Sequence, residues 1–129
     1  QRRLQWLGTR DISAFLTVPT AMAFQQRHGW HAVRAQCHAL AQQTLQRWCV
    51  LTGQAPVAEG NDCGQMVLLP MPGADADALK ATLYDRFRIE VPVTQHQDQV
   101  FVRVSVQGYN TQNDLDRLLE ALLVLRGTQ

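Results

Sequence analysis

Valines recur at every second position near the end of the chain, and this pattern constrains the fold more than any other feature. Between positions 100 and 106 they alternate with Phe101, Arg103 and Ser105. Successive side chains of a strand point to opposite faces, so the valines share one face and Arg103 belongs to the other. We therefore expect a strand that packs its valines on a core and turns one arginine away from that core.

A turn and a helix follow this strand. Gly108 and Asn110 interrupt the alternation, as residues of a turn do. Thr111 and Asp114 have the spacing of a capping box, in which two residues at the start of a helix bond each other's backbone. Five leucines then recur at helical spacing, namely Leu115, Leu118, Leu119, Leu122 and Leu123. The strand and the helix thus offer apolar faces to one core.

The preceding segment predicts the rest of a small layered domain. We expect a strand at 65–69, a helix capped by Asp75 or Asp77 that ends near Phe87, a strand over 89–93 and a polar turn over 94–99. The order strand, helix, strand, strand, helix is typical of an α+β fold, with helices on one face of a small, mostly antiparallel sheet.

A long helix is predicted from Trp30 to Leu51, and Gly53 ends it. Its apolar residues mark one side: Trp30, Val33, Cys37, Leu40, Ala41, Leu45 and Trp48. A helix of this length with a single apolar face suits a connection between two domains. His31 and His38 share a side of it, but two histidines are too few ligands for a metal site.

Composition excludes several classes of function. The 129 residues carry a formal net charge of +1, which gives no electrostatic case for nucleic acid or an anionic membrane. No apolar run reaches the roughly 20 residues of a membrane span. The three cysteines lack metal-ligand spacing, and their odd number fits free thiols in the reducing cytoplasm.

Gly8, Thr9, Arg10 and Asp11 predict a turn that leads into a helix. Backbone N–H groups at such a turn can bind a phosphate. The alternative is an ordinary capped turn without a ligand, which the residues alone favour.

Arg103 also allows two interpretations. It is either a surface arginine or a planar fork that binds a carboxylate with two hydrogen bonds.

Two segments carry a family resemblance. "VRVSVQGYNTQNDLDRLLEAL" from position 102 resembles the C-terminal signature of class V aminotransferases, which are enzymes of fold type I that use pyridoxal phosphate (PLP). "WLGTRDISAFLTVPTAMAF" from position 6 resembles the isopenicillin N epimerase-like branch of that family. The resemblance implies a C-terminal part only. Residues 1–29 would end the large PLP-binding domain, 30–53 would form the connecting helix and 54–129 the small α+β domain.

The resemblance also implies the site. The residues matching Gly8 and Thr9, with Arg10 less firmly, would reach the cofactor phosphate across the interface of a homodimer. The residue matching Arg103 would bind the α-carboxylate of an amino-acid substrate. The lysine that holds PLP would lie upstream of residue 1, because the single lysine, Lys80, falls inside a solvated helix. This chain would therefore contain no catalytic residue and would be inactive alone.

The reaction stays open among epimerase, lyase and aminotransferase. Related cysteine desulfurases need a reactive cysteine before the arginine strand, and residues 94–99 contain none, which argues against persulfide chemistry. Another class of function competes with all of these: a small α+β module that binds a ligand or a protein without catalysis.

Overall fold

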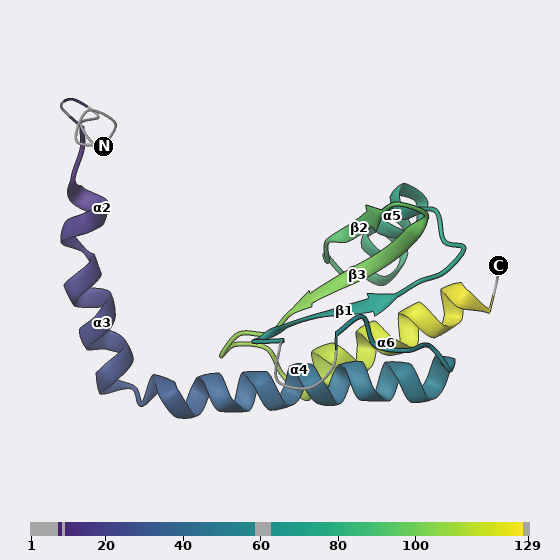
Figure 1. Cartoon of the computed structure of the whole chain (residues 1–129), viewed down its shortest axis with the longest axis horizontal. Coiled ribbons are helices and arrows are strands. Elements are labelled where there is room, and N and C mark those ends of the chain that lie inside the picture. The colour runs from purple at the N-terminus through teal and green to yellow at the C-terminus, as the bar shows by residue number, and fades with distance from the viewer. Residues whose placement is uncertain (1–7, 9, 59–62, 128–129) are drawn as a thin grey trace. The chain divides into compact units, whose positions relative to one another are not determined.

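The computed structural model describes residues 8, 10–58 and 63–127. These divide into two compact units, 1–32 and 33–129, which are described separately. The first contains the helices α2 (Ser13–Leu16) and α3 (Val18–Arg27), coloured purple in Figure 1. Gly29, with a φ of 58°, separates α3 from the next helix. The predicted domain boundaries after residues 29 and 53 stay predictions.

Helix α4 runs from Trp30 to Thr52, which confirms the predicted long helix. Gly53 ends it in the left-handed region with a φ of 69°, where glycine carries no steric penalty. The buried side of α4 consists of Cys37, Ala41, Thr44, Leu45 and Trp48. This matches the middle and the end of the predicted apolar side. Within the part of the chain that is described, no helix is both long and apolar enough to cross a bilayer.

The second unit is built on a three-stranded antiparallel sheet in the order β1-β3-β2. The strands are β1 (Met66–Pro70), β2 (Val93–His96) and β3 (Gln99–Ser105). Because β3 lies in the centre, its residues have neighbours on both sides: Leu68 of β1 lies opposite Arg103, and Thr94 of β2 lies opposite Phe101. The α+β class predicted from the sequence is confirmed.

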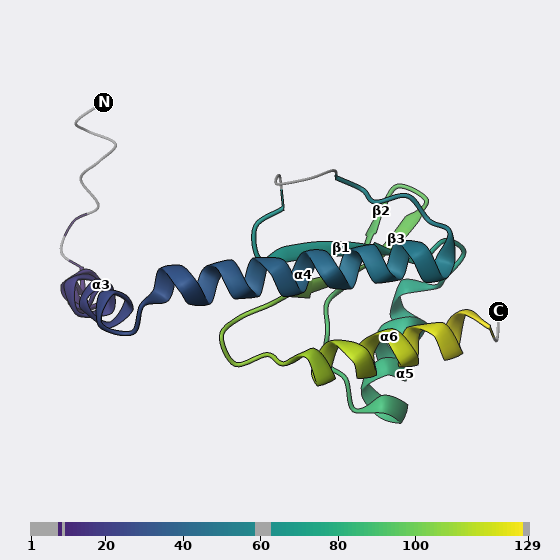
Figure 2. The ribbon, with the colours of Figure 1, turned by 90° about the horizontal axis from the view of Figure 1, so that it is seen from below.

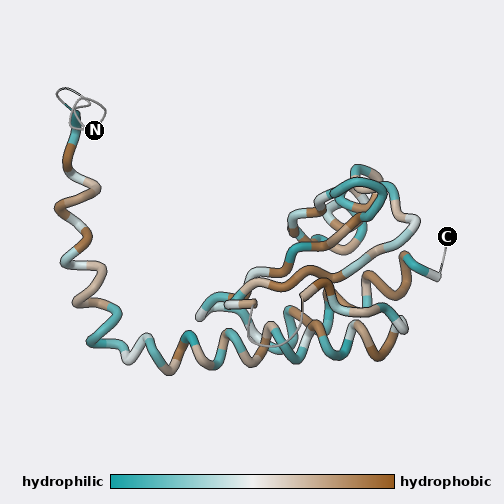
Figure 3. Tube along the Cα trace, in the orientation of Figure 1, coloured by the Kyte–Doolittle hydropathy of each residue, from teal (hydrophilic) through white to brown (hydrophobic). Residues whose placement is uncertain are grey.

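The alternation along β3 is also confirmed. The valines at 100, 102, 104 and 106 are buried, whereas Arg103 and Ser105 are exposed. Figure 3 shows the hydrophobic residues along the strands of the sheet. Phe101 is buried as well, although it lies on the face opposite the valines and outside the main core. The two faces of β3 therefore contact different surroundings.

Helices α4, α5 (Ala76–Phe87) and α6 (Gln112–Arg126) pack on the valine face, and Figures 1 and 2 show α4 and α6 side by side. Arg47 of α4 pairs with Asp116 of α6, and Trp48 Nε1–H donates to the carbonyl of Pro70 at 3.0 Å. The largest fully buried side chains are Trp48, Leu69, Met71, Leu83, Leu119, Leu122, Val67, Val102 and Thr44.

The predicted starts of α5 and α6 are confirmed. The Asp75 carboxylate accepts from the Ala78 N–H at 2.8 Å, and Thr111 with Asp114 forms a complete capping box. The backbone and side-chain hydrogen bonds from Thr111 lower the pKa of Asp114. The carboxylate is the form that accepts these bonds, so α6 starts from an ionised cap.

The strand predicted over 89–93 is wrong in position, because β2 starts at Val93 and continues to His96, into the predicted turn. Arg88 has a φ of 57°, and the N–H of Ile89 donates to the carbonyl of Leu83. The backbone there closes the end of α5 instead of starting a strand. Pro92 has no N–H to donate to a sheet. The actual turn is only Gln97 and Asp98, and Gln97 adopts a φ of 53°.

Candidate functional site

Arg103 lies in the middle of the central strand, on the face opposite the buried valines. Its backbone N–H donates to the carbonyl of Pro92 at 2.9 Å, and its register neighbour on the other side is Leu68. The backbone of Arg103 is therefore held from both sides while its side chain is exposed. Among the described residues, no hydrogen bond or ion pair occupies its guanidinium. A charged fork on a fixed backbone is thus available to a ligand.

A groove of about 510 Å³ opens beside this arginine. Its walls come from α4, from the segments that flank residues 59–62, and from β1. It is lined by Leu45, Val57, Ala58, Cys63, Gly64, Gln65, Met66, Val67, Leu68 and Arg103. Arg103 is the only charged residue among these described lining residues, so none of them is a carboxylate that would compete for it. The groove therefore offers one cationic group on a mostly apolar surface.

Two side chains fix the segment that precedes β1. His38 Nδ1–H donates to the carbonyl of Gly64 at 2.8 Å, which ties that segment to α4. The side-chain amide of Gln65 donates to the carbonyl of Val106 at 2.9 Å and to Gln107 Oε1 at 3.3 Å. Because these groups already bond the protein, Arg103 is the main polar group left to a ligand.

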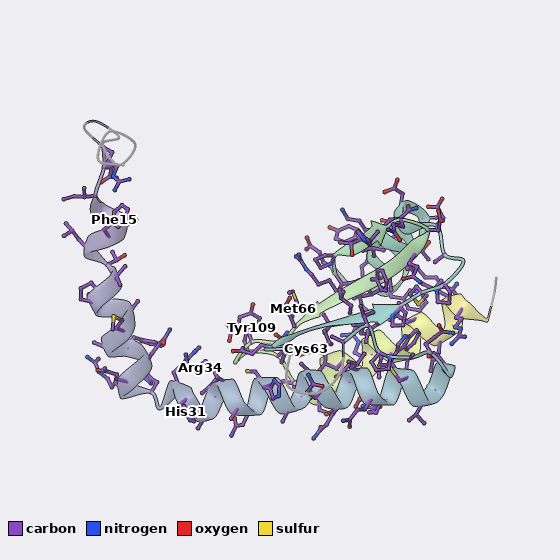
Figure 4. All side chains as sticks on the ribbon, in the orientation of Figure 1. Phe15, His31, Arg34, Cys63, Met66 and Tyr109 are labelled. Carbon is purple, nitrogen blue, oxygen red and sulfur yellow. The ribbon has the colours of Figure 1, made fainter. Side chains whose placement is uncertain are left out.

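Cys63, Met66 and Tyr109 gather at the end of the sheet where β1 begins and β3 has ended (Figure 4). Met66 lies opposite Ser105, the last residue of β3, and both are exposed. Cys63 lies in the loop before β1 and forms part of the groove wall. No local signal could have shown this, since the loop meets Arg103 only through the fold.

The predicted phosphate-binding residues belong to the other unit. Gly8 is exposed with a φ of 76°, and a side chain there would meet no atom within 4 Å, so a ligand has open access to its backbone. Thr9 lies outside the described residues. Arg10 is exposed, and its guanidinium carbon lies 4.7 Å from the centre of the Phe15 ring.

The Asp11 side chain already binds the first residue of α2, which follows these residues in the chain. Its carboxylate accepts from the hydroxyl of Ser13 and from the Ser13 N–H at 2.9 Å, and these hydrogen bonds lower its pKa. The first donor of α2 is therefore already occupied. A phosphate would depend on Gly8, Thr9 and Arg10 themselves rather than on the start of the helix.

The residues present fit PLP only in part. Gly8 and Arg10 can contribute to holding its phosphate, but Lys80 is exposed on α5. Within the described ranges, no three His, Cys, Asp or Glu side chains lie close enough together to hold a metal.

The chain was compared with known proteins. No family model matches the chain. It is 40% identical to isopenicillin N epimerase of Amycolatopsis lactamdurans over 94% of its length, and 34% identical to the same enzyme of Streptomyces clavuligerus over 98%. It is also 30% identical to L-cysteine desulfhydrase of Arabidopsis thaliana over 93% of its length. The chain spans about a third of each of these relatives.

Among solved structures, 8-amino-7-oxononanoate synthase of Francisella tularensis matches with a TM-score of 0.54 and 21% identity. The match covers 72% of this chain and 28% of that one, and it supports the fold alone. The covered shares agree with the predicted C-terminal part. The resemblance of this chain to the isopenicillin N epimerase-like branch of the class V aminotransferases is thereby confirmed.

Proposed function

We propose that this chain is the C-terminal part of a PLP-dependent enzyme that acts on an amino acid, and that Arg103 binds the α-carboxylate of the substrate. The observation that carries the proposal is the placement of Arg103. It is exposed on the face of the sheet opposite the buried valines and has no partner among the described residues, while β1 and Pro92 fix its backbone. The motif around it resembles the family signature at that position.

Arginine suits this role for a geometric reason. Its planar guanidinium presents two parallel N–H donors that match the two oxygens of a carboxylate. Such a pair fixes the orientation of the substrate as well as its position. The bond that breaks at Cα must be held in one direction, so an arginine on a rigid strand contributes through orientation.

When bound, PLP supplies the electron sink that stabilises negative charge at the substrate Cα. In this chain, Gly8, Thr9 and Arg10 would contribute to holding the cofactor phosphate of the partner subunit in a homodimer. The exposed backbone of Gly8 and the cationic Arg10 support this part of the proposal. The lysine that holds the cofactor would come from the rest of the enzyme, which we place in the cytoplasm.

We propose a reaction that moves a proton or eliminates a group at Cα or Cβ of the substrate. Of the three classes left open, the relatives favour epimerase and lyase over aminotransferase. Two of them are named as epimerases and one as a desulfhydrase, which removes a group from cysteine. An aminotransferase reaction stays possible on the resemblance alone. The α-carboxylate is common to all three classes, so the role of Arg103 does not depend on the choice.

The test compares Arg103→Ala and Arg103→Lys with the parent in the full-length enzyme. Hydrogen bonds to charged groups contribute roughly 1.5–3 kcal/mol each, so kcat/KM should fall about 100-fold or more in Arg103→Ala. Arg103→Lys should also be impaired, because an ammonium cannot reproduce the fork. The visible absorbance band of bound PLP should persist in both variants, because the cofactor is held elsewhere.

Arg117→Ala is the matched control, since Arg117 is an equally exposed arginine on α6 that lies away from the groove. It should leave kcat/KM unchanged. Unchanged kcat/KM in Arg103→Ala would refute the role in substrate binding. A lost PLP band in Arg103→Ala would assign Arg103 to the cofactor or to the fold instead.

A further inference from the structure

The groove beside Arg103 is mostly apolar and yet open to solvent. Met66 and Val57 line it with exposed fractions of 49% and 53%, although both are large hydrophobic side chains. When an apolar group covers such side chains, their surface is removed from water. This stabilises the complex by about 25 cal/mol per Å² of buried apolar surface. The groove thus favours a ligand with an apolar body.

The register of the sheet places this apolar surface within reach of the arginine. Leu68 lies directly opposite Arg103. Side chains that face each other across two antiparallel strands are immediate neighbours. Met66 is two residues along β1 on the same face, and Cβ atoms at such diagonal positions are still within reach of a long side chain. A molecule whose carboxylate binds the guanidinium can therefore extend its next few carbons over Leu68 and Met66.

The described residues of the groove provide few polar groups that could bind a second charge on the ligand. Among the described residues that line it, none is a carboxylate, and Arg103, assigned to the α-carboxylate, is the one cation. The carbonyl of Gly64 accepts from His38, and the amide of Gln65 donates to Val106 and Gln107. A charged side chain placed there would lose water without gaining a partner among the described lining residues, which costs free energy.

We propose that this groove binds the side chain of the substrate, and that it selects amino acids with large apolar side chains over those with charged ones. The inference rests on the proposed function, because it takes Arg103 as the ligand of the α-carboxylate. Met66 and Leu68 are then specificity-determining residues. Leu68 contacts the first carbons beyond Cα, and Met66 contacts the end of the side chain.

The test uses simple carboxylic acids and the 129-residue chain, with binding followed by ¹⁵N NMR. The probes are 3-phenylpropanoate, which has a carboxylate and an apolar body; acetate, which has the carboxylate alone; succinate, which carries a second charge; and 3-phenylpropan-1-ol, which has the body alone. The shifted signals should lie in β1 and β3. We expect 3-phenylpropanoate to bind about tenfold tighter than acetate or succinate, because part of its ring is removed from water.

Two variants separate this inference from the proposed function. Met66→Ser should weaken 3-phenylpropanoate to the level of acetate and leave acetate unchanged. Arg103→Ala should weaken both acids and leave the alcohol unchanged. Both residues are exposed, so neither variant removes core packing. Val50→Ser is the matched control, because Val50 is an exposed apolar residue of α4 that lies outside this groove.

The outcomes distinguish the two ideas. Equal binding of all three acids, unaffected by Met66→Ser but weakened by Arg103→Ala, would overturn the apolar groove and leave the carboxylate role intact. Acid binding that survives Arg103→Ala would refute the proposed function itself. Tighter binding of succinate than of 3-phenylpropanoate would also overturn the inference, because the groove would then favour a second charge.

Discussion

The two units of this chain use hydrophobic residues in opposite ways. In the second unit they form a core, and Ala41, Trp48, Leu69, Leu83 and Leu122 have no exposed surface at all. In the first unit, neither α2 nor α3 has a buried residue. Phe15 is 58% exposed and Leu16 68% exposed, and Figure 4 shows Phe15 projecting from its helix.

This difference separates two sources of helix stability. Helices α4, α5 and α6 are stabilised because they bury one side on the sheet. Helices of four and ten residues are too short to be stable in water on their own, and within the described residues α2 and α3 have no core to pack on. Exposed apolar clusters of this kind often mark contact surfaces, so we expect the first unit to gain stability from contacts with another surface.

Trp48→Ala should have the largest effect on the second unit. Trp48 is fully buried and its indole N–H bonds the carbonyl of Pro70, so the substitution opens a cavity and leaves that carbonyl unpaired. We expect a loss of about 3–5 kcal/mol in the free energy of unfolding. Urea denaturation followed by far-UV circular dichroism measures it. Val50→Ala on the same helix is the control, since Val50 is 83% exposed, and an equal loss there would contradict the assignment of the core.

The same substitution, leucine to alanine, should have different effects on stability in the two units. Leu83→Ala removes a fully buried side chain and should cost about 2–5 kcal/mol. Leu16→Ala removes an exposed side chain. The free energy of unfolding should then change by no more than about 0.5 kcal/mol. Both are measured by urea denaturation at one protein concentration. Equal effects would show that the first unit shares the core of the second.

Thr111→Ala tests a local feature, the capping box of α6. Loss of such a cap costs about 1 kcal/mol at neutral pH. The pKa of Asp114 is lowered in the folded chain. The ionised cap therefore stabilises the protein above the unfolded pKa of about 3.9. That contribution to stability is lost as the pH falls through the lower pKa that Asp114 has in the folded chain.

The stability difference between the parent and Thr111→Ala should therefore be constant near pH 7 and shrink in strong acid. Denaturation at several pH values measures it. Asn113→Ala is the control, because Asn113 is an exposed residue of the same first turn that is not part of the capping box. A difference that grows as the pH falls would contradict the ionised cap.

The smallest effect on stability is expected from Phe15→Ser combined with Leu16→Ser. Neither residue contributes to the core, so the free energy of unfolding of the second unit should not change. Self-association of the isolated chain should weaken, because the variant removes exposed apolar surface. Sedimentation velocity over a range of concentrations measures this. A parent chain that stays monomeric at every concentration would contradict the contact surface.

The sequence alone determined the elements whose signals are local. The alternating valines predicted β3 and the exposure of Arg103, and the spacing of Thr111 and Asp114 predicted the start of α6. Gly53 predicted the end of α4. These succeeded because each depends on the periodicity or backbone preference of a few adjacent residues. The position of β2 failed, because Ile89 bonds the end of α5, a competition that alternation does not show.

Only the tertiary structure decided the surroundings of Arg103. The strand order puts Leu68 opposite this arginine, and the bond from His38 to Gly64 brings the segment with Cys63 to the groove. These residues are separated by tens of positions in the chain, so no short pattern relates them. The sequence could show that Arg103 faces away from the core, but which side chains share that face depends on strand pairing, which is a property of the whole fold.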